Sequence, residues 1–200
     1  LDPALPELMF RRFEALDLHQ LTVVCGCGGG DAVRPVLPQV LSQSLRLVLD
    51  ADALNAIAAD TSLRSLVQAR ARRGLSTVLT PHPLEAARLL GSGSAAVQSD
   101  RLAAVRQLAD DLACTVVLKG SGTLIATPGE APALNLTGNA RLGTAGTGDV
   151  LAGLIGARLA GGAAPFQATC AAVYQHGEAA DAWPCEEALT AGALARRLRD

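Results

Sequence analysis

The sequence predicts a three-layer α/β domain, in which a largely parallel sheet carries helices on both faces. Short runs of aliphatic and β-branched residues alternate along the chain with longer stretches of helical periodicity. The short runs are apolar throughout, which is typical of strands that are buried on both faces. Two hundred residues, half of them apolar, suffice for one such domain, so we expect a single domain over residues 1–200.

Strands are expected at six short apolar runs that stand between turn signals. These runs cover 21–25, 45–49, 76–80, 114–118, 123–127 and 132–136. Only KGSG, at 119–122, separates the fourth run from the fifth. Because so short a connection joins antiparallel strands in a hairpin, we expect one edge of the sheet to be antiparallel.

Helices are expected where apolar residues recur with a helical period. The expected helices cover 31–43, 52–58, 61–72, 83–90, 95–112, 149–160, 165–182 and 188–199. GSGS, at 91–94, is expected to form a loop between two of them. Its glycine pattern follows a helix instead of a strand, which argues against a Rossmann dinucleotide site.

Composition argues against nucleic-acid and membrane partners. Only 2% of the residues are aromatic, so few rings could stack on bases, and the formal net charge is −2 with no basic run. No apolar stretch is long enough to span a bilayer. The five cysteines fit reduced thiols in the cytoplasm better than a disulfide framework. Cys25-Gly-Cys27 could be a metal or redox pair, but neither a second pair nor a histidine cluster accompanies it.

Unusual polar and glycine-rich clusters follow most of the predicted strands. They are GCGGG at 26–30, DADALN at 50–55, PHPLE at 81–85, KGSGT at 119–123 and TGNARLGTAGTGD at 137–149. Because ligands of open α/β sheets bind beyond the carboxyl ends of the strands, we expect a ligand site at this rim. Structural alternatives stay open for three clusters: a flexible turn at 26–30, Asp50 and Asp52 as an N-cap and a first-turn helix charge, and a structural or merely exposed His82.

Lys119 is the single lysine of the chain, since sixteen of the seventeen basic residues are arginines. It stands at the end of a predicted strand and is followed by Gly120, Ser121, Gly122 and Thr123. A cation beside closely approaching backbone N–H groups suits phosphate oxygens. The segment is not a Walker A loop, because in that motif glycine precedes the lysine and Ser or Thr follows it.

GTAGTGD, at 143–149, places one carboxylate at the start of a predicted helix. Gly146 and Gly148, on either side of Thr147, let the main chain turn its N–H groups inward, and the helix adds its positive end. Such a pocket would stabilise a phosphoryl group during transfer. Asp149 at its lip is suited to act as a base on an attacking hydroxyl. The alternative is that Asp149 only caps the helix.

Four segments resemble the signature blocks of the nucleotide-dependent NAD(P)H-hydrate dehydratases, a branch of the ribokinase-like fold. They are LVLDADALNAIA at 47–58, TVLTPHPLEAARLLG at 77–91, VVLKGSGT at 116–123 and TGNARLGTAGTGDVLAGLIGARLAGG at 137–162. AAVYQHGEAAD, at 171–181, is similar to the penultimate helix of the family. The GxGD pattern is shared by ribokinase-like kinases in general, whereas LTPHP together with LDADALN narrows the resemblance to the dehydratases.

The resemblance implies an enzyme that repairs hydrated NADH or NADPH. The hydroxyl of the hydrated ring is phosphorylated from ADP or ATP with Mg²⁺, and phosphate is then lost. By the same resemblance Asp149 is the base, residues 119–123 contact the nucleotide, and Gly146, Thr147 and Gly148 face its phosphates. Asn139 is a weaker candidate for the nucleotide, and His82 and Gly28 are expected to touch the hydrated dinucleotide. No metal ligands are indicated.

The resemblance also implies a cytoplasmic homo-oligomer and an epimerase that is either fused to the domain or separate. Two residues depart from the family glycine loop: Cys27 stands where proline is usual, and Gly29 where a larger apolar residue is usual. We therefore expect a looser loop. The family carries a further segment before position 1, with its first strand and part of the substrate wall, so the domain is expected to be truncated at its N-terminus.

Other functions stay open from the sequence. A ribokinase-like small-molecule kinase, of the thiazole- or pyrimidine-alcohol type, would stop at the phosphorylated product. An inactive module would bind nucleotide without turnover, and a purely structural domain would bind none.

Overall fold

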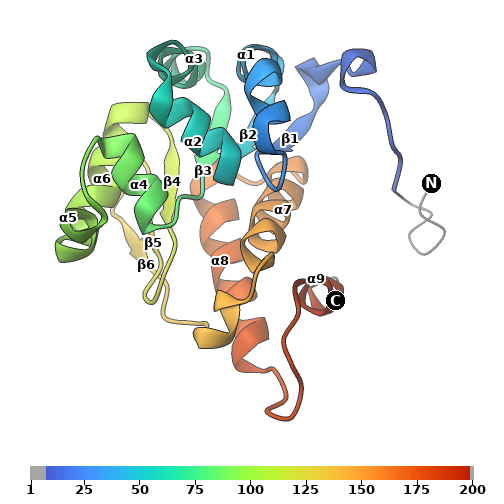
Figure 1. The fold of residues 1–200 in the computed structure, drawn as a ribbon, viewed down its shortest axis with the longest axis vertical. Coiled ribbons are helices and arrows are strands. Elements are labelled where there is room, and N and C mark those ends of the chain that lie inside the picture. Colours follow the sequence, from blue (N-terminus) through green and yellow to red (C-terminus); the bar gives the residue numbers. More distant parts are fainter. Residues whose placement is uncertain (1–7, 199–200) are drawn as a thin grey trace.

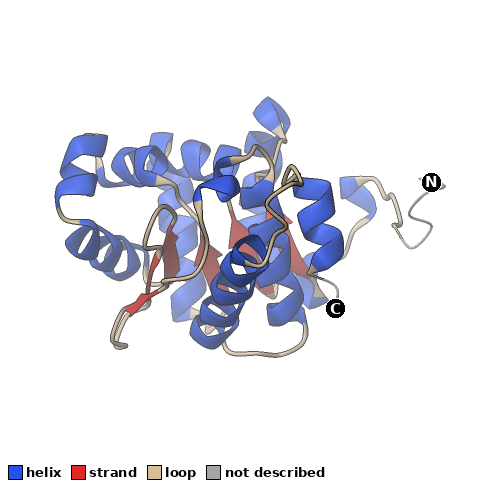
Figure 2. Ribbon diagram, turned by 90° about the horizontal axis from the view of Figure 1, so that it is seen from below, coloured by secondary structure: helices blue, strands red, loops and turns tan. Residues whose placement is uncertain are grey.

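The computed structural model describes residues 8–198, in which a sheet lies between two layers of helices (Figure 1, Figure 2). The order of its strands follows the order of the chain. The strands are β1 (Thr22–Cys25), β2 (Arg46–Leu49), β3 (Ser76–Leu79), β4 (Thr115–Leu118), β5 (Leu124–Ala126) and β6 (Ala133–Leu134). All six predicted strands are confirmed, with ends that differ by at most two residues.

The sheet is parallel from β1 to β4 and antiparallel from β4 to β6. In the β4–β5 hairpin, Val116 pairs with Ala126 and Leu118 with Leu124. The predicted antiparallel edge is therefore confirmed. Because β1 to β4 run the same way, the segments that follow them emerge at one rim of the sheet.

The helices connect the strands and then continue beyond them. They are α1 (Val33–Gln43), α2 (Ala51–Ala59), α3 (Thr61–Arg72), α4 (Pro83–Leu90), α5 (Ser94–Ser99), α6 (Arg101–Leu112), α7 (Thr147–Ala160), α8 (Pro165–Asp181) and α9 (Ala191–Arg197). Short 3-10 helices lie at Phe13–Ala15, Leu18–Gln20, Gly30–Ala32 and Ala140–Gly143. Residue 199, the expected end of the last helix, lies outside the described residues.

The prediction of one helix over 95–112 is wrong, because Asp100 divides it into α5 and α6. The backbone of Asp100 leaves the helical region, and its carboxylate accepts a hydrogen bond from the N–H of Ala103. This is the arrangement of an N-cap, which begins a new helix.

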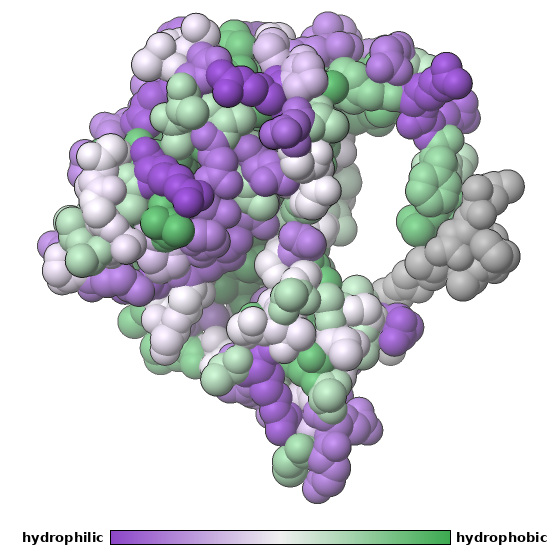
Figure 3. Space-filling view, in the orientation of Figure 1, coloured by the Kyte–Doolittle hydropathy of each residue, from purple (hydrophilic) through white to green (hydrophobic). Residues whose placement is uncertain are grey.

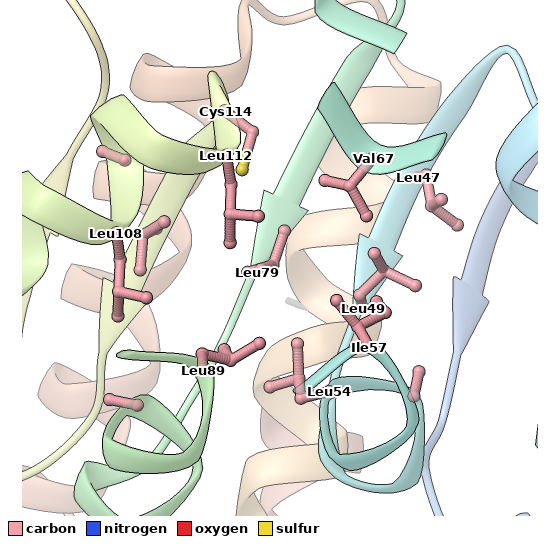
Figure 4. Packing of buried hydrophobic residues seen from close by; sticks show 14 of the residues in the cluster. Leu47, Leu49, Leu54, Ile57, Val67, Leu79, Leu89, Leu108, Leu112 and Cys114 are labelled. Atoms are coloured by element: carbon pink, nitrogen blue, oxygen red, sulfur yellow. The ribbon is translucent and has the colours of Figure 1, made fainter. Parts of the chain in front are cut away.

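Alternate residues of the strands bury themselves in two different cores, one on each face of the sheet. On one face, Leu47, Leu49 and Leu79 pack against α1 to α6, as Figure 4 shows for part of this cluster. On the other face, Val48 and Val78 pack against residues of α7 and α8. Both faces of each central strand are thus covered, which explains the uninterrupted apolar runs and confirms the three layers.

The first described residues extend from the body as an arm, at the right of Figure 1, whereas Leu18, nearer to β1, is buried in the core. Leu8, Met9 and Phe10 of the arm are exposed, and Figure 3 shows apolar surface on this arm. β1 has a neighbour on one side only, β2, within the described residues. No helix among residues 8–198 combines the length and the hydropathy needed to cross a bilayer.

Candidate active site

The rim beyond β1 to β4 is joined by backbone hydrogen bonds between successive strand ends. The N–H of Asp50 donates to the carbonyl of Cys25, and that of Thr80 to the carbonyl of Leu49. The N–H of Lys119 donates to the carbonyl of Pro81. These bonds fix the first residue after each strand, so the side chains at the rim stand on a rigid base.

Lys119 forms a buried ion pair with Asp50 at this rim. Its Nζ lies 2.7 Å from Oδ1 of Asp50, whose side chain is only 2% exposed. The same oxygen accepts a hydrogen bond from the N–H of Ala51 at 2.9 Å, so Asp50 also caps α2. The alternative that Asp50 caps a helix is correct. It is incomplete, because Asp50 also forms the ion pair with Lys119, which lies 69 residues further along the chain.

Helix α7 begins directly beside this ion pair. Gly146, with φ of 84°, is its N-cap, and no side chain caps the helix. A Cβ atom on Gly148 would lie 3.5 Å from Nζ of Lys119 and 3.9 Å from Oδ2 of Asp50. Because glycine leaves this space open, the first turn of α7 can present its backbone N–H groups and its positive end to an anion next to Lys119.

Asp149 lies in the first turn of α7 with an exposed side chain. The capping alternative for Asp149 is wrong, since the N-cap is Gly146 and no side chain accepts from the first N–H groups of the helix. A sulfur atom of Cys27 and one carboxylate oxygen each of Asp50 and Asp149 lie within 4.8 Å of one another. Asp149 is thus a free carboxylate at the lip of the anion pocket.

The thiol of Cys27 lies beside Asp149, with its sulfur within 4.8 Å of a carboxylate oxygen. Burial raises the pKa of this thiol to about 12, assisted by the negative charges of Asp50 and Asp149, while Lys119 acts in the opposite direction. The thiol is therefore protonated at neutral pH. The sequence alone did not predict that Cys27 lies beside these two carboxylates.

The loop that follows Lys119 is shaped by glycines and held by an arginine. Gly120 and Gly122 have φ of 137° and 67°, values that side chains rarely tolerate. Arg101 donates hydrogen bonds to the carbonyls of Leu118, Lys119 and Gly122 at 3.1 to 3.4 Å. Burial lowers the pKa of its guanidinium. No pattern in the sequence indicated this contact, since Arg101 is one of many arginines on predicted helices.

Comparison with known proteins identifies the family of the chain. The model of the NAD(P)H-hydrate dehydratase family matches residues 3–200. The chain belongs to this family. The ADP-dependent (S)-NAD(P)H-hydrate dehydratase of Neisseria meningitidis is 45% identical over 199 residues, which cover 96% of the chain and 66% of that relative.

Two further relatives of the dehydratase family differ in length. The bifunctional NAD(P)H-hydrate repair enzyme Nnr of Escherichia coli is 37% identical over 89% of the chain, and the match covers 34% of that enzyme. The chain thus spans about a third to two thirds of these curated relatives. A Bacillus subtilis ADP/ATP-dependent dehydratase, co-crystallised with ATP/Mg²⁺, matches with a TM-score of 0.72 and 32% identity, covering 88% of this chain and 61% of that chain. The expected ribokinase-like α/β fold is confirmed.

In the PHP segment of the dehydratase family, His82 is the N-cap of α4. Its Nδ1 accepts hydrogen bonds from the N–H groups of Leu84 and Glu85, and Glu85 accepts one from the N–H of His82. The side chain is still 47% exposed. The structural alternative for His82 is therefore correct, and its imidazole edge stays accessible at the rim.

The glycine loop is tied to α2 by a hydrogen bond. Oδ2 of Asp52 accepts a hydrogen bond from the N–H of Gly30 at 2.8 Å, and the loop ends in a 3-10 turn. Gly28 has φ of 62°, and a Cβ atom there would meet nothing within 4 Å. Gly28 is thus an exposed position that needs glycine for its backbone and not because of a neighbour.

Several residues that the family resemblance assigned to nucleotide contact form hydrogen bonds within the protein. The amide of Asn139 donates to Ala180 and Asp181 and accepts from the N–H of Arg141. The hydroxyl of Thr147 donates to the carbonyls of Leu142 and Thr144. Their side chains therefore shape the loop before α7. The groups that these residues can offer to a ligand are mainly backbone groups. Thr123 likewise donates to the carbonyl of Gly120, whereas Ser121 is exposed.

Proposed function

We propose that this chain carries out the nucleotide-dependent dehydration of NAD(P)H hydrate. In this reaction the hydroxyl of the hydrated nicotinamide ring takes a phosphoryl group from ADP or ATP, and the phosphate ester then loses inorganic phosphate to restore the ring. The observation that carries the proposal is the free Asp149 carboxylate at the first turn of α7, beside the anion pocket of Lys119 and Gly148. Family membership and the names of the relatives support the same reaction.

The nucleotide is placed by residues 119–123 together with Gly146, Thr147 and Gly148. Backbone N–H groups lie at the start of α7 beside the pocket, and the ammonium group of Lys119, which is paired with Asp50, adds further hydrogen-bond donors. Because Asp50 holds this ammonium group at 2.7 Å, the cation is positioned before any phosphate arrives. Such preorganisation stabilises charge that develops during phosphoryl transfer without a later rearrangement.

Asp149 accepts the proton of the ring hydroxyl as that oxygen attacks the phosphoryl group. Its exposure on the ligand side of the rim leaves room for the substrate, and the thiol of Cys27 lies beside it. His82 and Gly28, which are exposed along the same rim, are proposed to contact the hydrated dinucleotide.

The residues present fit the Mg²⁺ that accompanies the nucleotide. Carboxylate oxygens are the ligands this hard cation prefers, and Asp50 would supply one next to the anion pocket. When bound, Mg²⁺ neutralises negative charge on the phosphate oxygens.

The decisive experiment compares Asp149→Asn with the unchanged chain in turnover of hydrated NADH with ADP or ATP. We expect the variant to bind nucleotide normally in calorimetry and to lose turnover by roughly a thousandfold or more, because the amide cannot accept the proton. Asp110→Asn is the matched control, since Asp110 is an exposed carboxylate on α6. Turnover is followed by NADH absorbance and released phosphate.

Two results would contradict the proposal. Retention of most of the rate in Asp149→Asn would remove Asp149 as the base. A stable phosphate ester in place of free phosphate would indicate a small-molecule kinase, and nucleotide binding without any product would indicate an inactive module.

We further propose that the chain works in the cytoplasm as part of a homo-oligomer, with an epimerase fused to it or separate. The bifunctional name of the Escherichia coli relative supports the pairing of two repair activities. The exposed apolar residues Leu8, Met9 and Phe10 on the arm before β1 support an interface.

A further inference from the structure

Three side chains that can bind a metal ion meet next to Lys119. Cys27 follows β1, Asp50 follows β2, and Asp149 belongs to α7, so three separate elements bring them together. The thiol sulfur and one oxygen of each carboxylate lie within 4.8 Å of one another. Asp50 is buried, Cys27 half-buried and Asp149 exposed, so the cluster opens toward solvent on the side of Asp149.

We propose that Cys27, Asp50 and Asp149 form a binding site for a thiophilic divalent cation such as Zn²⁺, and that this cation blocks Asp149. The blocking rests on the proposed function, in which Asp149 is the base, whereas the binding does not. Zn²⁺ takes thiolate at about 2.3 Å and carboxylate oxygen at about 2.0 to 2.2 Å, in a tetrahedron that would leave one position for water.

Asp149 and Asp50 have oxygen atoms to spare for the ion. Asp149 is exposed, and its carboxylate lies beside the Cys27 thiol, which would become a ligand. Asp50 receives Lys119 and the N–H of Ala51 on Oδ1, while its Oδ2 faces the open space at Gly148. A cation can therefore join the cluster without breaking the ion pair with Lys119.

The charges of the cluster match a divalent cation. Two carboxylates and a thiolate carry three negative charges, and the ammonium group of Lys119 carries one positive charge. The cluster would therefore have a net charge of −2. Zn²⁺ neutralises this charge, and the thiol proton is released to solvent as the sulfur binds.

The thiol also gives the site its selectivity. Mg²⁺ binds oxygen ligands and keeps several of its waters, whereas Zn²⁺ and Cd²⁺ accept thiolate readily. Cys27 thus favours soft cations over the Mg²⁺ that the proposed reaction uses. A bound soft cation occupies the oxygen of Asp149 that would otherwise accept the substrate proton.

The test of binding uses the full chain without nucleotide, in a buffer free of thiols. Cd²⁺ is followed by the ultraviolet charge-transfer band of a metal thiolate, and Zn²⁺ by calorimetry. We expect one ion per chain with a thiolate band. Cys27→Ser should lose the band and bind Zn²⁺ roughly 30-fold or more weakly, because the soft ligand is gone. Cys27→Ala, checked by circular dichroism, gives the same information if the serine variant folds poorly.

Cys25→Ser and Cys185→Ser are the matched controls. Cys25 lies two residues away on β1 and is half-buried, and Cys185 is exposed near the C-terminal end of the chain. Both should keep the band and the affinity of the unchanged chain. A band that survives in both Cys27 variants, or that disappears equally in Cys25→Ser, would overturn the site.

Inhibition is tested separately as the ratio of turnover rates with and without Zn²⁺. We expect a loss of roughly tenfold or more in the unchanged chain near its binding concentration, and a much smaller loss in Cys27→Ser. Equal inhibition of the unchanged chain and of Cys27→Ser would overturn the proposal that the cation blocks Asp149. A chain without turnover would contradict the proposed function, while the Cd²⁺ band would still decide the metal site.

Discussion

Arg70 is buried without a carboxylate partner at the end of the sheet opposite Lys119. Its guanidinium donates to the hydroxyl of Thr77 and to the carbonyls of Leu41, Ser44 and Ser76, at 2.7 to 3.0 Å. Burial lowers its pKa to about 10, which leaves the group charged at neutral pH. One side chain thus satisfies four acceptors, which lie near the end of α1, just before β2 and at the start of β3.

Replacing Arg70 with methionine should lower the free energy of unfolding by about 2 to 4 kcal/mol, because the four acceptors lose their donor in a region without water. Arg72→Met, at an exposed position on the same helix, should change it by less than about 0.5 kcal/mol. Urea denaturation of both variants checks the difference. Equal effects would mean that the Arg70 hydrogen bonds contribute no net stability.

At the scale of elements, helix α7 crosses β1 so closely that only glycine fits at the contact. A Cβ atom on Gly156 would lie 2.6 Å from Cγ2 of Val24, whereas one on Gly153 would meet nothing within 4 Å. Since α7 carries Asp149 at its first turn, this contact also sets how the proposed base stands over the rim.

Gly156→Ala should therefore destabilise the fold by about 1 to 3 kcal/mol through the clash with Val24. Gly153→Ala, on the same helix, should stabilise it by about 0.5 to 1 kcal/mol, because alanine favours a helix interior. Adding Val24→Ala to Gly156→Ala should recover part of the loss. A double variant no more stable than expected from the two single losses would exclude the contact as the cause.

A second link between elements joins α8 to the start of α7. Nε2 of the buried His176 lies 2.9 Å from the carbonyl of Thr147, and because a carbonyl only accepts, this nitrogen carries the proton. Burial lowers the pKa of His176; the bond to Thr147 acts against this shift, and Lys119 adds to it. The neutral imidazole thus holds α8 against the first turn of the helix that carries Asp149.

For the whole molecule, the lowered pKa of His176 makes stability depend on pH. Below about pH 6.5 the unfolded chain binds a proton that the folded chain resists, so the free energy of unfolding falls until the pH also passes the folded pKa. We expect the loss of free energy of unfolding between about pH 7.5 and 5.5 to be smaller in His176→Gln, whose amide keeps a hydrogen-bond donor. His19→Gln, at an exposed histidine, should leave the loss unchanged. Identical slopes in all three chains would contradict this origin.

The architecture of the whole molecule could be predicted to a large extent from local pattern. Apolar runs buried on both faces gave the strands within a few residues, and their order gave the rim at which the polar clusters meet. The break at Asp100 was missed, because apolar residues keep a helical period across it and only the capping bond to Ala103 ends it. Capping by Asp50 and His82 could be proposed as an alternative because it depends on neighbours in sequence.

What the sequence determined by itself was the kind of residue available at the rim: a single lysine, a glycine-rich helix start and one carboxylate after it. Only the tertiary structure decided which of these residues touch. It paired Lys119 with Asp50, placed Cys27 beside Asp149, and directed Arg101 to the loop after β4. These contacts join elements far apart in the chain, and their distances depend on how the strands and helices pack, which no local periodicity encodes.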